Sequence, residues 1–144
     1  MNRVKLMLEP INTKHTDKYI RSSKDVKNIV EEEYLYSGHE IFSVIYLNRN
    51  NRIIAVELPH TIGTSTATIV DTQRIVRNAL TLGAQAIVCV HNHPSDNLQP
   101  SSCDKDVTKK LSTALNYFDI KLLDHVILDS KVSDYYSFAD NGII

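Results

Sequence analysis

A short apolar run that passes directly into two histidines constrains this 144-residue chain more than any other feature. Residues 86–90 are apolar and mostly β-branched, which is typical of a buried strand. His91 and His93 follow two residues apart, so strand periodicity places both imidazoles on one side. Asn92 then points away from the two rings, and we expect it to hydrogen-bond the polar loop that follows.

A polar loop between Pro94 and Pro100 separates the two histidines from the start of a helix. Ser101-x-x-Asp104 has the form of a capping box, which predicts a helix N-terminus at this point. A residue held at a helix start can also bind a metal or hydrogen-bond a substrate oxygen. The strand end and the helix start can therefore bring two imidazoles and one carboxylate to a single ion.

This ligand set suits more than one metal. Around zinc it leaves the fourth tetrahedral position open to water, as in catalytic rather than structural sites. Zinc lowers the pKa of such a water to about 7 and polarises carbonyls, which favours amide or ester hydrolysis. The same ligands form the facial triad of non-haem iron oxygenases, and that alternative stays open. The chain contains neither the zincin pattern His-Glu-x-x-His nor the deaminase pattern with Pro-Cys-x-x-Cys.

The motif resembles that of JAMM (MPN+) metalloproteases, in which a distant Glu precedes His-x-His-Pro, a spacer and Ser-x-x-Asp. The sequence of residues 91–95, together with Leu-Leu-Asp-His at 122–125, is similar to that of the RadC branch of that superfamily. The similarity runs from about Ser22 to the C-terminus. It implies a single JAB/MPN-type domain over residues 22–144, of mixed α/β class with cytidine-deaminase-like layering, and we expect residues 1–21 to form an N-terminal arm.

The resemblance also implies roles for individual residues. Zinc would be held by His91, His93 and Asp104. Ser101 would assist the oxyanion, and a Glu would act as general acid/base. Family order places that Glu at the start of the first core strand, a position that Glu40 occupies, with Glu57 in the next strand as the competitor. The expected activity is a zinc-dependent metallohydrolase that cleaves amide or isopeptide bonds of a peptide or isopeptide substrate.

Two features depart from the RadC pattern. Asp96 stands where this branch usually has Gly, which predicts a changed turn and a negative charge near the metal. The helix-hairpin-helix segment that precedes the domain in full-length members finds no room here, which weakens the case for DNA binding. Because the family name carries a DNA-repair association, the alternative function is a DNA-repair-associated or mobile-element accessory protein that binds nucleic acid or protein.

Composition argues against nucleic acid and membranes as partners. The formal net charge is -1 and the sequence pI is about 6.6, so the chain lacks a basic electrostatic footprint. A metal-dependent nuclease would also neutralise phosphate poorly with one zinc in a near-neutral cleft. Cys89 is expected to be a core thiol and Cys103 a partly exposed one, rather than a disulfide pair. With no signal peptide or membrane span expected, the predicted setting is cytoplasmic.

Periodicity and turn residues predict a mixed sheet flanked by helices. Ser23 is expected to cap a helix that reaches about Tyr36, and Asp71 to cap another that stops at Gly83. The predicted strands are residues 41–47 and 53–58, joined by a turn at 48–51, then the motif strand and a last strand near 120–128. Residues 59–68 are predicted to be a loop.

The helix after the motif is expected to face the core with five of its side chains, Val107, Leu111, Ala114, Leu115 and Phe118. His125 lies in the last strand and could orient a metal ligand, although a hydrogen-bonded core role fits it better.

Overall fold

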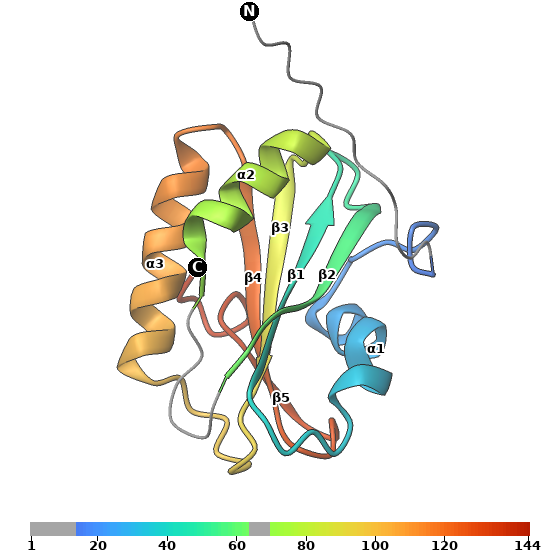
Figure 1. The fold of residues 1–144 in the computed structure, drawn as a ribbon, viewed down its shortest axis with the longest axis vertical. Coiled ribbons are helices and arrows are strands. Elements are labelled where there is room, and N and C mark those ends of the chain that lie inside the picture. Colours follow the sequence, from blue (N-terminus) through green and yellow to red (C-terminus); the bar gives the residue numbers. More distant parts are fainter. Residues whose placement is uncertain (1–13, 64–69) are drawn as a thin grey trace, which may run out of the picture.

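The structure is a computed structural model that describes residues 14–63 and 70–144. In chain order its elements are α1 (Ser23–Tyr34), β1 (Ile41–Leu47), β2 (Ile53–Ile62), α2 (Thr72–Leu82), β3 (Ala86–Asn92), α3 (Ser102–Asn116), β4 (Lys121–Leu128) and β5 (Tyr135–Ser137). The strands form one mixed sheet in the order β2-β1-β3-β4-β5, in which only β3 and β4 run parallel. The predicted mixed α/β class, with helices flanking the sheet, is confirmed (Figure 1).

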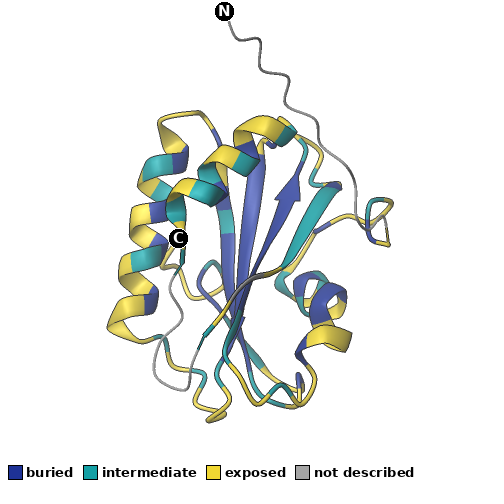
Figure 2. Cartoon of the chain, viewed as in Figure 1, coloured by how far each residue is buried: buried dark blue, intermediate teal, exposed yellow. Residues whose placement is uncertain are grey.

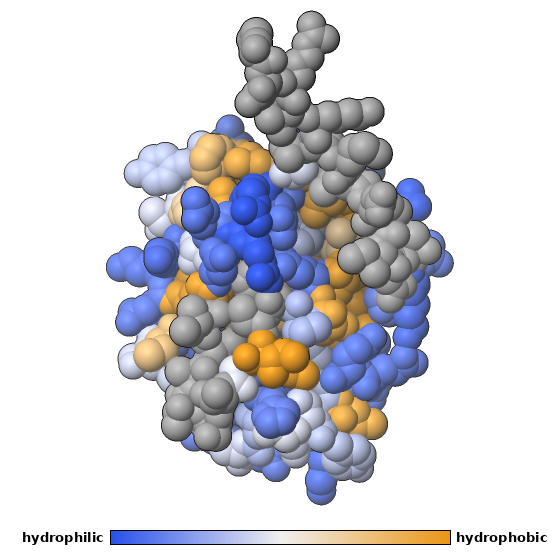
Figure 3. All heavy atoms as spheres, viewed as in Figure 1, coloured by the Kyte–Doolittle hydropathy of each residue, from blue (hydrophilic) through white to orange (hydrophobic). Residues whose placement is uncertain are grey.

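Helices cover both faces of the sheet. Figure 1 shows α1 on one face and α2 with α3 on the other. Each face has its own apolar core, one packed under α1 and one under the other two helices. The central strand β3 is buried at all seven of its positions, which explains its nearly unbroken apolar sequence (Figure 2). The face in Figure 3 is largely hydrophilic, with separate hydrophobic patches.

The first two strands form the predicted hairpin. The Asn48 carboxamide accepts from the main-chain N–H groups of Asn50 and Arg52, and Asn51 adopts a left-handed conformation with φ 60°. The second strand is longer than predicted, because β2 continues through the expected loop start at Pro59 as far as Ile62. Proline is tolerated there because β2 is an edge strand and its pairing with β1 shifts register at this point. Residues 64–68 of the predicted loop lie outside the described residues.

The first helix begins one residue away from the predicted position. Ser22, not Ser23, is the N-cap, because its side chain accepts from the Asp25 N–H while Asp25 reaches back to the Ser22 N–H. The helix ends at Tyr34, two residues before the predicted end at Tyr36, which adopts a left-handed φ of 57°.

The second helix agrees with its predicted boundaries. Asp71 is the N-cap and accepts from the Arg74 N–H, and Gly83 ends the helix in the left-handed conformation with φ 66°.

The C-terminal third of the chain differs from the prediction in two places. Helix α3 ends at Asn116, so Phe118 lies beyond it and is about half exposed (51%) instead of facing the core. The three-residue strand β5, which pairs antiparallel with β4, was not predicted, because so short a run carries no periodic pattern.

The predicted N-terminal arm lies mostly outside the described residues, which begin at residue 14. Within the described part, Ile20 is buried in the core under α1, and Tyr19 forms a β-bridge with Arg52. Among the helices of the described ranges, none is both long enough and apolar enough to cross a membrane.

Candidate metal centre

Two elements bring the predicted metal ligands together. His91 lies in β3 and is buried, and His93 follows directly after that strand with its side chain partly exposed. Asp104 comes from the first turn of α3, where Ser101 and Asp104 form the predicted capping box. The Asp104 N–H donates to Ser101 Oγ at 3.0 Å, and the Ser101 N–H donates to Asp104 Oδ2 at 2.7 Å. The cap thus holds the carboxylate of Asp104 at a defined place next to the strand end.

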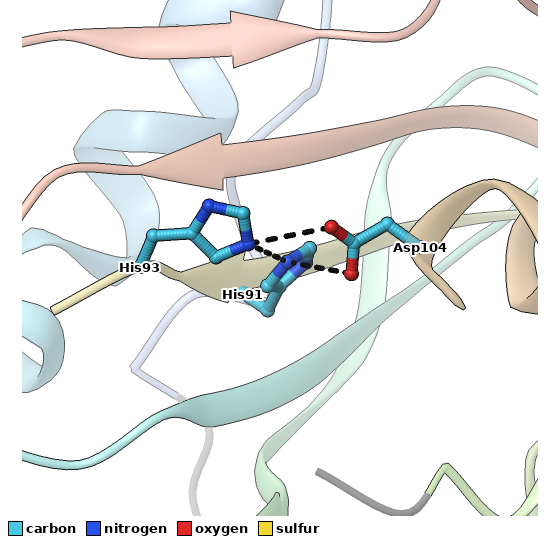
Figure 4. A group of neighbouring side chains, drawn as sticks. All are labelled: His91, His93 and Asp104. Carbon is cyan, nitrogen blue, oxygen red and sulfur yellow. Dashed lines mark hydrogen bonds and ion pairs between the residues drawn. The ribbon is translucent and has the colours of Figure 1, made fainter. Parts of the chain in front are cut away.

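The three side chains turn their ligand atoms toward one point (Figure 4). The Nε2 atoms of His91 and His93 are 3.0 Å apart. Oδ1 of Asp104 lies 3.2 Å from Nε2 of His91, and Oδ2 lies 3.3 Å from Nε2 of His93. Zinc bonds of about 2.0–2.1 Å require tetrahedral ligand atoms to lie about 3.3 Å apart, so the cluster has the right size for a zinc ion. Cys103, next to Asp104, is exposed and is not part of the cluster among the described residues.

Hydrogen bonding leaves the metal-facing nitrogen of His93 available. His93 Nδ1 lies 2.5 Å from the main-chain oxygen of Asn97, and because a carbonyl only accepts, Nδ1 must carry the proton. In the neutral ring Nε2 therefore offers its lone pair to the cluster. The pKa of His93 is raised, chiefly because the protonated ring can donate a hydrogen bond to Asp104. Burial opposes this shift, and the Asn97 carbonyl and the nearby charge of Glu40 support it.

The carboxylate at the centre is held in its charged form. Burial alone would raise the pKa of Asp104, but the adjacent imidazoles of His91 and His93, which can donate to it when they are protonated, outweigh this effect and hold the pKa far below its usual range. The bond from the Ser101 N–H acts in the same direction. Asp104 is therefore an anion at neutral pH, as a metal ligand must be.

The sheet register indicates that Glu40 lies on the same face of the sheet as the two histidines. In the antiparallel pairing of β1 with β3, Phe42 lies opposite His91, so continuing the register by two residues sets Glu40 opposite His93. Directly opposite residues project from the same face of a sheet. The Asn92 side chain supports this register beyond the strand end, because it donates to the His39 carbonyl at 2.9 Å and accepts from the Ile41 N–H at 2.7 Å.

These two bonds clamp the main chain on both sides of Glu40. The prediction that Asn92 bonds the polar loop after His93 was wrong, because its carboxamide bonds the main chain at His39 and Ile41 instead.

Glu57, the competing candidate, occupies a different environment. It lies opposite Val44 in β2, and its carboxylate accepts from the Tyr46 hydroxyl at 2.8 Å and from the Asn78 amide at 3.2 Å. An ion pair of 2.8 Å joins it to Arg74. Glu57 therefore links β2 to α2 and to β1.

Two residues behind the cluster were not recognised from the sequence as a group. His125 Nε2 lies 2.7 Å from His91 Nδ1, and His125 Nδ1 lies 2.6 Å from the Thr108 hydroxyl, which also contacts the Asp104 main-chain oxygen at 2.5 Å. Burial, followed by the neighbouring His91, lowers the His125 pKa well below its ordinary value. A signal for Thr108 was present, since it lies four residues after Asp104 on one helix face.

Asp96 adopts a backbone conformation that is usually favoured by glycine. Its φ of 63° lies in the left-handed region, where Asp is among the residues best tolerated. Its carboxylate does not point freely into solvent, because Oδ1 accepts from the Ser130 N–H at 2.7 Å. Asp96 therefore ties its turn to the loop after β4.

A mixed sheet between helices, with a His-His-Asp cluster where β3 meets α3, defines this protein as an α/β domain with a candidate metal centre. Residues 20–143 match the family described as the RadC-like JAB domain. A UPF0758 protein of Flavobacterium johnsoniae is 40% identical over 126 residues, which are 88% of this chain and 54% of that protein. The chain belongs to the RadC-like JAB domain family.

Other relatives show the same coverage. A UPF0758 protein of Caldanaerobacter subterraneus is 40% identical over 83% of this chain and 53% of its own length. One from Pseudomonas fluorescens is 34% identical over 88% of this chain and 55% of its own length. The chain thus spans about half the length of the curated relatives that it matches.

Proposed function

We propose that this domain is a zinc-dependent hydrolase of amide or isopeptide bonds. The observation that carries the proposal is the spacing of the His91, His93 and Asp104 ligand atoms, 3.0–3.3 Å apart. Three protein ligands leave a tetrahedral metal one open position, which is the mark of a catalytic zinc site. When bound, zinc would supply a Lewis acid and lower the pKa of water to about 7.

Glu40 is the proposed general acid/base. A position of its carboxylate beside the ligands is supported by its place opposite His93 in the extended register and by the Asn92 clamp around it. There it can accept a proton from the attacking water and pass it to the nitrogen of the leaving amine. This transfer lets the amine leave as a neutral group and regenerates the Glu40 carboxylate. Glu57 is already engaged by Arg74 and Tyr46, which leaves Glu40 as the candidate for this role.

Ser101 is the proposed donor to the developing oxyanion. In the capping box its hydroxyl oxygen accepts from the Asp104 N–H, and the hydroxyl proton is left to donate elsewhere. A donor held at a helix N-terminus is suited to a carbonyl oxygen that becomes negative, because the helix dipole favours the same charge. The cap therefore uses a lone pair of the Ser101 hydroxyl oxygen, and the proposed catalytic role uses its proton.

Purified protein is expected to hold close to one zinc per chain. Two neutral imidazoles and one carboxylate match the ligands that zinc prefers, whereas the same set with iron would indicate an oxygenase. Elemental analysis of protein produced with zinc and iron both supplied decides between the two metals. Recovery of iron, or of no metal, would contradict the zinc assignment.

Binding to DNA is expected to be weak and generic. The chain has 16 Lys and Arg against 17 Asp and Glu, so it has no excess of cations for phosphate. Affinity for labelled single-stranded, duplex and branched DNA should fall with added salt and show no structural preference, while a parallel screen detects peptide or isopeptide cleavage. Tight, structure-selective binding that survives metal removal, with no cleavage, would favour the DNA-associated accessory function.

A further inference from the structure

We propose that Thr108 and His125 are positioning residues that fix the tautomer of His91 and so prepare its Nε2 lone pair for the metal. The chain of contacts starts and ends on metal ligands, because it runs from the main-chain carbonyl of Asp104 through Thr108 and His125 to His91. The inference rests on the proposed zinc site. It adds an internal device that orders that site before any metal arrives.

The donor and the acceptor of each hydrogen bond in this series follow from the first group, the main-chain carbonyl of Asp104. The main-chain carbonyl of Asp104 can only accept a hydrogen bond. Thr108 must therefore donate its single hydroxyl proton to this oxygen, which lies 2.5 Å from Thr108 Oγ1. The Thr108 oxygen can then only accept from His125 Nδ1, which lies 2.6 Å away. In a neutral His125, Nε2 is consequently an acceptor, and at 2.7 Å it requires a proton on His91 Nδ1. The Nε2 atom of His91 is left with its lone pair, pointing at the cluster.

The surroundings keep His125 neutral and in place. Its ring stacks on Phe138 with centroids 4.9 Å apart and meets the edge of Phe42 at 5.6 Å, and its side chain is only 1% exposed. Among the described residues, the hydrogen-bond partners of its ring nitrogens are the neutral Thr108 hydroxyl and the His91 ring, so neither nitrogen bonds a carboxylate that could balance a positive charge. A cation buried in this way would be strongly disfavoured.

The two histidine ligands are thus ordered by different means. The tautomer of His93 is set by one contact with the Asn97 carbonyl in the adjacent loop. The tautomer of His91 is set from helix α3 across strand β4, through side chains that are all buried. Outer partners of metal ligands typically contribute 10- to 100-fold to metal affinity, and we expect Thr108 and His125 to do the same.

The test compares Thr108→Val with Thr108→Ser. Valine keeps the shape but removes the hydroxyl, so His125 loses its acceptor and the His91 ring is no longer restricted to one tautomer. Zinc affinity from chelator competition should fall about tenfold in Thr108→Val. Thr108→Ser, which restores the hydroxyl, should return it to the starting value. Thr113→Val provides the matched control, because it makes the same change at an exposed position of α3.

Nitrogen-15 NMR of the histidine rings supplies a readout that does not depend on hydrolysis. In the metal-free protein at mildly alkaline pH, His91 should show a protonated Nδ1 and an unprotonated Nε2, and Thr108→Val should shift this population whereas Thr108→Ser should not. Equal tautomer populations and equal zinc affinities in all three proteins would overturn the proposal. If the protein proves not to be a hydrolase, the tautomer measurement still decides, and His125→Gln, which retains an acceptor and a donor, should outperform His125→Leu in both readouts.

Discussion

Asp104→Ala should abolish zinc binding and, with it, hydrolysis. The substitution removes one of three protein ligands, and the affinity loss should exceed the roughly 100-fold that outer partners of a ligand can contribute. It also removes the acceptor of the Ser101 N–H in the capping box, which should lower the free energy of unfolding by about 1 kcal/mol. Chelator competition measures the first effect, and denaturant unfolding measures the second.

Two further variants separate these effects. Asp104→Asn keeps an oxygen for the Ser101 N–H but loses the charge, so it should retain the cap and still bind zinc poorly. Asp106→Ala, an exposed position in the same helix, should leave zinc affinity unchanged. Zinc binding by Asp104→Ala at the affinity of the unaltered protein would remove Asp104 from the ligand set.

Glu40→Gln should lower kcat by about 10²–10⁴-fold while zinc content and stability stay the same. The amide keeps the size of the carboxylate but cannot take a proton from water. Because Asn92 holds the main chain at His39 and Ile41, the substituted side chain should stay in place. The measurement is the cleavage rate of a peptide or isopeptide substrate by zinc-loaded protein, with the metal quantified in the same sample.

Glu57→Gln is the matched control. It weakens the ion pair with Arg74 and should therefore lower the free energy of unfolding by about 1 kcal/mol, with little change in kcat. The reverse pattern, in which Glu57→Gln loses activity and Glu40→Gln keeps it, would transfer the role of general base to Glu57.

Local signals in the sequence were sufficient for the parts of the site that lie on single elements. The apolar run before His91 predicted the strand, and the Ser101-x-x-Asp104 spacing predicted the helix start, because each pattern describes contacts within a few residues. The cluster of the three ligands followed from joining these two predictions across a short loop.

Contacts between distant elements could not be predicted in this way. His125 reaches His91 because β4 runs parallel to β3 with Cys89 opposite His125, and no residue pattern specifies that register. The same holds for the clamp on Glu40, since the pairing of Asn92 with the start of β1 joins positions more than 50 residues apart. Order of elements was therefore predictable, and their mutual alignment was not.

The Asn92 clamp has a consequence for how this scaffold can change. Asn92, in the neighbouring strand, holds the main chain on both sides of Glu40, so we expect the connection between α1 and β1 to tolerate changes in length. A side chain added at Gly38, within that connection, would meet nothing within 4 Å. Insertions at Gly38 should therefore leave the ligand cluster intact, and this point offers a place to attach substrate-binding loops beside the proposed general base.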